Sequence, residues 1–149
     1  MIAPVYVANN FIKRGQDESV EITPLKLQKL VYFLYKEYIK QTGNLLFSEQ
    51  FETWKYGPVI PSIYAEFNSY GSSAIKSFAV DSQGKCYIVT ETGIFKDCID
   101  KIWSLYKECS GDTLSRLTHR DGTAWSKAKE NEDRYLNVED IKSEADLIV

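Results

Sequence analysis

Apolar positions recur along most of the chain at the spacing of a helix. In residues 23–43 they return every three or four residues, at Leu27, Leu30, Val31, Leu34 and Tyr38. This spacing predicts one long helix with a buried face. Thr23 is suited to cap its first turn, Pro24 fits the first helical position, and Gly43 favours termination. Similar spacing predicts a shorter helix over residues 4–14 and a second long helix over residues 92–111.

The stretch "FETWKYGPVIPSIYAEFNSYG", residues 51–71, combines six aromatic residues with two prolines and two glycines. Its first five residues favour a short strand, and Gly57-Pro58 is expected to break that strand in a rigid corner. Pro61 then starts a helix that Gly71 ends. We expect Trp54 to plug the core, together with three other aromatic residues of this stretch, Phe51, Phe67 and Tyr70.

Residues 76–90 contain two β-prone runs around Ser82-Gln83-Gly84, which predicts a hairpin. Shorter helices follow, with Thr123 and Asn137 as caps. The fold class predicted is therefore α+β and mostly α. It comprises about five to six helices and a small antiparallel sheet, made of a strand near 50–55 and the hairpin near 76–90. All 149 residues are expected to form one domain, residues 1–149.

Composition and charge narrow the possible environment and partners. The net charge of −3 gives no basic footprint for nucleic acid. No run approaches the ~20 apolar residues of a membrane span, and no secretion signal is seen. The three cysteines are an odd number and show no zinc-ligand spacing. We therefore expect a reduced, cytoplasmic protein with no metal, no membrane and no nucleic-acid partner.

The sequence offers few groups for catalysis. It has no phosphate-binding glycine loop and no nucleophile elbow, so we expect neither an enzyme nor a cofactor. The single histidine, His119, could be a general base beside Asp121, but a structural histidine at a helix C-terminus is the favoured interpretation. Three lysines of the long helix are interpreted as a solvated face rather than a phosphate site: Lys26, Lys29 and Lys36.

Three motifs in this order resemble the Panacea domain, the antitoxin domain of SocA-like and phage-associated GepA-like proteins. They are the helix "LKLQKLVYFLY", the corner "WKYGPV" within residues 45–71, and the late "LSRLTHRDGTAW". The resemblance extends over roughly residues 5–148. The family commonly has proline before the last tryptophan of these motifs, whereas this chain has Ala124 before Trp125.

The resemblance implies a bacterial or prophage antitoxin that neutralises a cognate toxin by direct protein binding. Action as an adaptor for a ClpXP-type protease is a further possibility that the family implies. Two alternatives stay open: a phage or mobile-element interaction protein without a cognate toxin, and a small hydrolase using His119. The expected partner-binding residues are Lys55, Tyr56, His119 and Trp125. The expected structural signature is Trp54, Gly57, Pro58 and Pro61.

Overall fold

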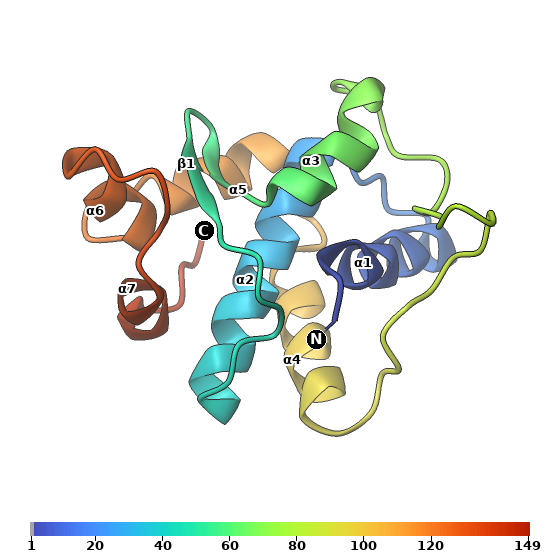
Figure 1. Cartoon of the computed structure of the whole chain (residues 1–149), viewed down its shortest axis with the longest axis horizontal. Helices are drawn as coiled ribbons and strands as arrows, with labels where there is room; N and C mark the ends of the chain where they lie inside the picture. Colours follow the sequence, from blue (N-terminus) through green and yellow to red (C-terminus); the bar gives the residue numbers. More distant parts are fainter. Residues whose placement is uncertain (1) are drawn as a thin grey trace.

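A computed structural model describes residues 2–149 and shows a mainly helical protein with one small sheet (Figure 1). The α+β, mostly α class is thus confirmed. The helices are α1 (Pro4–Glu18), α2 (Pro24–Thr42), α3 (Pro61–Phe67), α4 (Gly93–Tyr106), α5 (Gly111–Thr118), α6 (Ala124–Glu130) and α7 (Val138–Ser143). The strands are β1 (Glu52–Trp54) and β2 (Gly57–Val59), and a 3-10 turn, η1 (Asn68–Tyr70), extends α3.

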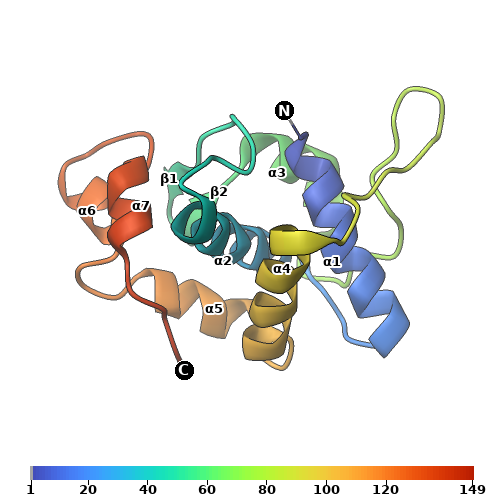
Figure 2. The same ribbon diagram turned by 90° about the horizontal axis from the view of Figure 1, so that it is seen from below.

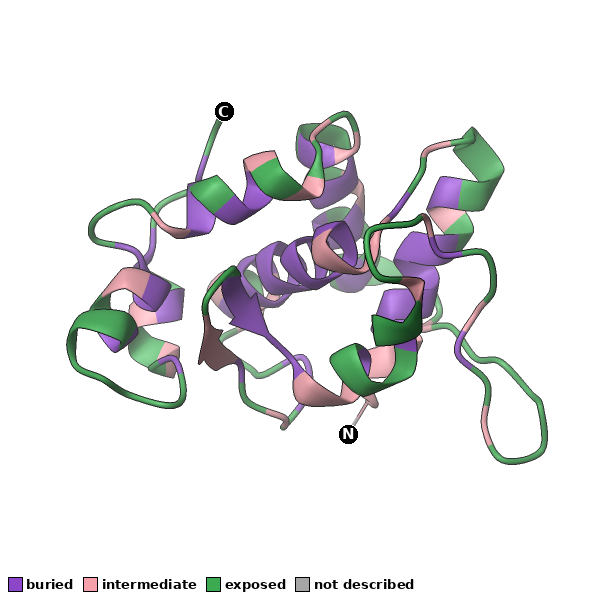
Figure 3. Cartoon of the chain, turned by 90° about the horizontal axis from the view of Figure 1, so that it is seen from above, coloured by how far each residue is buried: buried purple, intermediate pink, exposed green. Residues whose placement is uncertain are grey.

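Helix α2 is the central element of the fold. The side chain of Thr23 accepts the backbone N–H of Lys26 at its start, and Gly43 ends it in the left-handed conformation, as predicted. Thirteen of its 19 residues are buried, so that it is covered on every side and not on one face only. Figure 2 shows α1 and α4 on one side of it and α6 and α7 on the other. In Figure 3, α2 is almost entirely buried.

The three α2 lysines are buried, and their interpretation as a solvated face is wrong. Lys26, Lys29 and Lys36 are each at most 5% exposed. The ammonium group of Lys26 donates to the carbonyl of Lys107 at 2.5 Å, and that of Lys29 donates to the carbonyl of Pro58 at 2.9 Å. Because α2 is central, even its polar positions face neighbouring elements. Their long side chains reach backbone carbonyls there and so connect α2 to its surroundings.

The third lysine, Lys36, belongs to a buried ion pair with Glu144. Its Nζ lies 2.6 Å from Glu144 Oε2, and both side chains are less than 5% exposed. The other carboxylate oxygen accepts the hydroxyl of Tyr32 at 3.1 Å and the backbone N–H of Ala124 at 2.8 Å. Burial outweighs the attraction of Glu144 and lowers the pKa of Lys36. This one carboxylate therefore joins α2, the start of α6 and the segment that follows α7.

The predicted hairpin near 76–90 contains no strand, and this part of the sheet prediction is wrong. Among residues 2–149, the sheet consists of β1 and β2 alone, paired antiparallel with Trp54 opposite Gly57. Gly57-Pro58 does not break the strand as expected, because these residues begin its partner. Proline is tolerated in β2 because this strand has a neighbouring strand on one side only. The N–H that Pro58 lacks is therefore not needed for pairing with a second strand.

Two asparagines of α1 explain why residues 76–90 form no ladder. The amide of Asn9 accepts the N–H of Ala79 and donates to the carbonyls of both Ala79 and Tyr87. The amide of Asn10 accepts the N–H of Val89 and donates to its carbonyl. These buried amides provide the hydrogen bonds that a second strand would have provided. Asn9 also connects the two β-prone runs, because it bonds to Ala79 in the first run and to Tyr87 in the second.

The aromatic residues of the 51–71 stretch divide between core and surface. Phe51 and Phe67 are buried as expected, while Tyr70 only packs against the edge of the core. Trp54 is half-buried and does not plug the core, which corrects the sequence-based expectation. Its ring meets the ring of Tyr64 of α3 edge to face, with 4.7 Å between centroids. Trp54 therefore lies where the sheet meets α3, at the protein surface.

Candidate functional site

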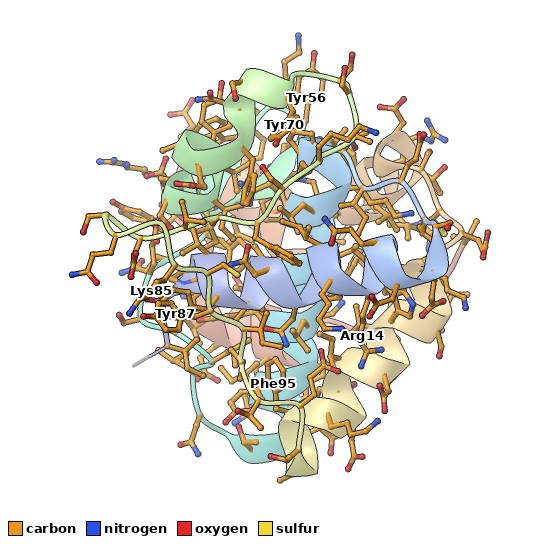
Figure 4. All side chains as sticks on the ribbon, turned by 90° about the vertical axis from the view of Figure 1, so that its right-hand side faces the viewer. Arg14, Tyr56, Tyr70, Lys85, Tyr87 and Phe95 are labelled. Carbon is orange, nitrogen blue, oxygen red and sulfur yellow. The ribbon has the colours of Figure 1, made fainter. Side chains whose placement is uncertain are left out.

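The turn between β1 and β2 presents two side chains to solvent. These are Lys55 and Tyr56, which we call the hairpin tip. Tyr56 is 60% exposed, and the ammonium group of Lys55 lies 5.5 Å from the centre of its ring. Figure 4 shows Tyr56 near one end of the molecule. The tip thus offers a cation and an aromatic ring side by side, and tyrosine is enriched in binding hot spots.

The backbone of the tip is fixed by side chains from α5 and α6 and from the residue that ends α5. Three consecutive carbonyls are held in this way: Ser115 Oγ donates to Tyr56 O at 2.6 Å, His119 Nε2 lies 2.8 Å from Lys55 O, and Trp125 Nε1 donates to Trp54 O at 2.8 Å. The tip is therefore exposed in its side chains but constrained in its main chain.

Helix α2 fixes the second strand in the same manner. Gln28 forms a paired contact with Ile60, accepting its N–H at 2.9 Å and donating to its carbonyl at 3.1 Å. One residue further along α2, Lys29 donates to Pro58 O. Desolvation lowers the pKa of Lys29 to about 7. The "KLQKL" motif thus positions the "WKYGPV" motif, which explains structurally why the two occur in one chain.

His119 ends α5 and has the structural role that the sequence favoured. Its Nδ1 lies 2.6 Å from the carbonyl of Ser115, and its Nε2 faces the carbonyl of Lys55. Both ring nitrogens thus face main-chain oxygens of the protein itself, and neither is directed at an open site for a substrate. The ring centroid lies 4.0 Å from that of Trp125. This arrangement supports the tip and does not resemble a general base.

The four expected partner-binding residues therefore lie together, with unequal exposure. Lys55 and Tyr56 form the tip, while His119 and Trp125 hold it from behind; Trp125 is buried. Sequence analysis missed Ser115, Gln28 and Lys29 among the supporting residues. Their signal was their presence inside the same three motifs, but a polar residue in a motif does not disclose which carbonyl it contacts.

An apolar cavity of about 670 Å³ opens beside the tip. We call it the hairpin groove. It lies between the β1–β2 hairpin, α3 and the N-terminal ends of α2 and α5. Its walls are mainly apolar and aromatic, and include Leu25, Trp54, Val59, Ile63, Tyr64 and Phe67. Lys55 and Asp112 add one charge of each sign to its lining. The tip and the groove form one continuous candidate site, because Lys55 and Tyr56 belong to both.

Other kinds of site are not evident in the described chain. Over residues 2–149, histidine, cysteine and acidic side chains form no group of three or more that could hold a metal ion. Within the same residues, no helix combines the length and the apolar character needed to cross a membrane.

Comparison with known proteins gives a family. The family model described as "Antitoxin SocA-like, Panacea domain" matches residues 27–126, which is more than half of the chain. The matched span contains the hairpin and every side chain described above as holding it. The chain belongs to the SocA-like Panacea-domain family. Within this Panacea domain, the three sequence motifs have a shared structural role, since all of them meet at the hairpin.

One known protein is similar to this chain over most of its length. It is the protein named Antitoxin SocA from Caulobacter vibrioides, which is 28% identical over 124 residues. The alignment covers 80% of this chain and 66% of the relative, so the match spans slightly less than two thirds of the relative's length. No solved structure matches the chain.

Gly57 of this Panacea domain is required by both its backbone and its surroundings. Its φ is +114°, and a Cβ atom would lie 2.6 Å from Thr118 Oγ1 and 2.8 Å from Lys29 Cε. We expect Gly57→Ala to lower the free energy of unfolding by about 1–3 kcal/mol from backbone strain, with the contact adding to that. Urea unfolding followed by tryptophan fluorescence would measure it.

Gly84→Ala is the matched control for this prediction. Gly84 also has positive φ, at +76°, but nothing lies within 4 Å of its Cβ position. Its substitution should cost less, because only the backbone term applies. Equal losses at the two positions would show that the close approach of Gly57 to α5 and α2 does not matter.

Proposed function

We propose that this Panacea domain is an antitoxin that neutralises a cognate protein toxin by binding it directly at the hairpin tip. In this proposal residues 1–149 act as one domain in the bacterial cytoplasm, without turnover and without a cofactor. The observation that carries the proposal is the combination of exposed Lys55 and Tyr56 side chains with a fixed main chain. A main chain that is already ordered loses little entropy on binding, which favours tight association.

The arrangement of His119 supports binding over catalysis. Both of its ring nitrogens face backbone carbonyls, and Asp121 is not among their contacts. Nothing in this geometry activates a nucleophile or a water molecule. The family membership points in the same direction. Among residues 2–149, the contacts of His119 do not favour the hydrolase alternative. The family membership favours an antitoxin over an interaction protein without a cognate toxin.

Co-expression tests this function. The protein encoded beside this chain is expressed alone and with it, and growth is scored. Rescue of growth is the expected result, and rescue should persist in His119→Ala, because Ser115 and Trp125 still hold the carbonyls on either side of Lys55. If the neighbouring protein is harmless alone, or if it stays toxic in the presence of this chain, the antitoxin proposal is wrong.

The same pair of proteins separates direct neutralisation from protease delivery. A purified toxin that binds in a fixed ratio and is inhibited without any protease supports neutralisation by binding. Toxin that stays active in the purified complex, but disappears from cells only when a ClpXP-type protease is present, supports the adaptor route instead.

A further inference from the structure

The hairpin groove is an open apolar site whose aromatic wall is left uncovered. Tyr64 is 46% exposed although its ring packs edge to face on the half-buried ring of Trp54. Behind this pair lie Ile63 and Phe67, which are buried. The exposed part of the wall is thus continuous with the core, so that apolar groups entering the groove would extend an existing packed surface.

A partner cannot add a strand to this site, because both edges of the hairpin are already used. On the outer edge of β1, Thr53 N–H donates to Arg134 O at 2.8 Å, and Glu52 forms a bridge with Tyr135. On the outer edge of β2, the carbonyl of Pro58 and both backbone groups of the residue after the strand are bonded to α2 side chains. Strand addition needs free backbone groups, so recognition in the groove must use side chains.

The shape and the charges of the groove limit what can fill it. Its volume of about 670 Å³ holds several side chains rather than one. Lys55 of the hairpin and Asp112 of α5 both line it, and neither forms an ion pair with any of residues 2–149. The complementary occupant therefore has large apolar side chains on one face, a carboxylate near Lys55 and a basic group near Asp112.

From these observations we propose that the groove binds one amphipathic helix of the toxin. Apolar side chains at i, i+3 and i+4 would enter against Trp54 and Tyr64, which is the way a helix fills a groove between other helices. An acidic residue of that helix would face Lys55, and a basic residue would face Asp112. This inference rests on the proposed function, and it names the part of the toxin that the antitoxin recognises.

Tyr64→Glu tests the groove, with Tyr87→Glu as its matched control. Tyr87 is 44% exposed, almost as much as Tyr64, and lies away from Tyr56 in Figure 4. The probe is the purified neighbouring protein whose toxicity the wild-type chain relieves. We expect Tyr64→Glu to weaken its binding about thirtyfold and Tyr87→Glu to leave it within about threefold. Unchanged melting temperatures would confirm that both variants fold.

Cross-linking then identifies the occupant. A photoreactive phenylalanine analogue replaces Tyr64 in one variant and Tyr56 in another, and the linked toxin residues are mapped by mass spectrometry. We expect them to fall within one segment at spacings of three, four or seven residues. Links at spacings of two residues, or links scattered over separate loops, would contradict the proposal that the occupant is a helix. Full binding by Tyr64→Glu would overturn the groove but leave the proposed function intact, whereas failure of wild-type binding would remove both.

Discussion

Replacing Glu144 with alanine is expected to lower the free energy of unfolding by about 3–5 kcal/mol. The substitution leaves the ammonium group of Lys36 buried without its counter-charge. It also removes the acceptor for the hydroxyl of Tyr32 and for the N–H of Ala124. Removing one partner of a buried ion pair costs the desolvation of the other, which greatly exceeds the worth of an exposed pair. Chemical denaturation followed by circular dichroism gives the measurement.

Two variants make this result specific to the buried pair. Asp17→Ala breaks the exposed pair with Lys13 and should cost less than about 1 kcal/mol. The double variant Lys36→Met, Glu144→Ala should recover part of the loss, because it removes the uncompensated charge. If Glu144→Ala were no more costly than Asp17→Ala, the carboxylate would not be joining the C-terminal segment to α2 as described.

Lys29→Met is expected to change the stability of the protein in a strongly pH-dependent way. Burial lowers the pKa of Lys29 from 10.5 in the unfolded chain to about 7 in the folded one. The unfolded state therefore binds more protons between these values, and the cost of Lys29 to stability grows as the pH falls from 10.5 to 7. Below pH 7 both states are protonated and the cost is complete. The free energy of unfolding of Lys29→Met, taken relative to wild type, should therefore be about 3 kcal/mol higher at pH 6 than at pH 9.5.

Urea unfolding of both proteins at the two pH values measures this difference. Leu30→Met, at the next position of α2, is the control because it carries no ionisable group, so its effect should be the same at both pH values. A difference between Lys29→Met and wild type that does not vary with pH would mean that Lys29 is not desolvated beneath β2.

The local features of the fold could be predicted from the sequence, whereas the tertiary ones could not. The start and end of α2 follow from Thr23, Pro24 and Gly43, because capping is decided within one turn. Thr123 and Asn137 cap the helices that follow them for the same reason. The burial of Lys29, by contrast, depends on α5 and β2 covering α2, and a helical periodicity contains no information about elements that are distant in sequence.

The missing hairpin has a comparable cause. The β-prone runs in residues 76–90 predict a hairpin, but Asn9 and Asn10 bond to these runs from 70 and 79 residues away. The motif singles out Lys55 and Tyr56, and their exposure is compatible with the proposed binding surface. The groove was not found, because its walls come from three separate parts of the chain.

A calorimetric titration of the purified toxin with this protein tests the central claim most directly. Wild type and the tip variant Lys55→Glu, Tyr56→Ala are compared in the presence of EDTA. The account predicts binding of the wild type in a fixed stoichiometric ratio, with toxin inhibition complete at that ratio. It predicts that the tip variant remains folded and that its affinity for the toxin falls by about thirtyfold or more. Inhibition complete far below one equivalent, or undiminished binding by the tip variant, would contradict it.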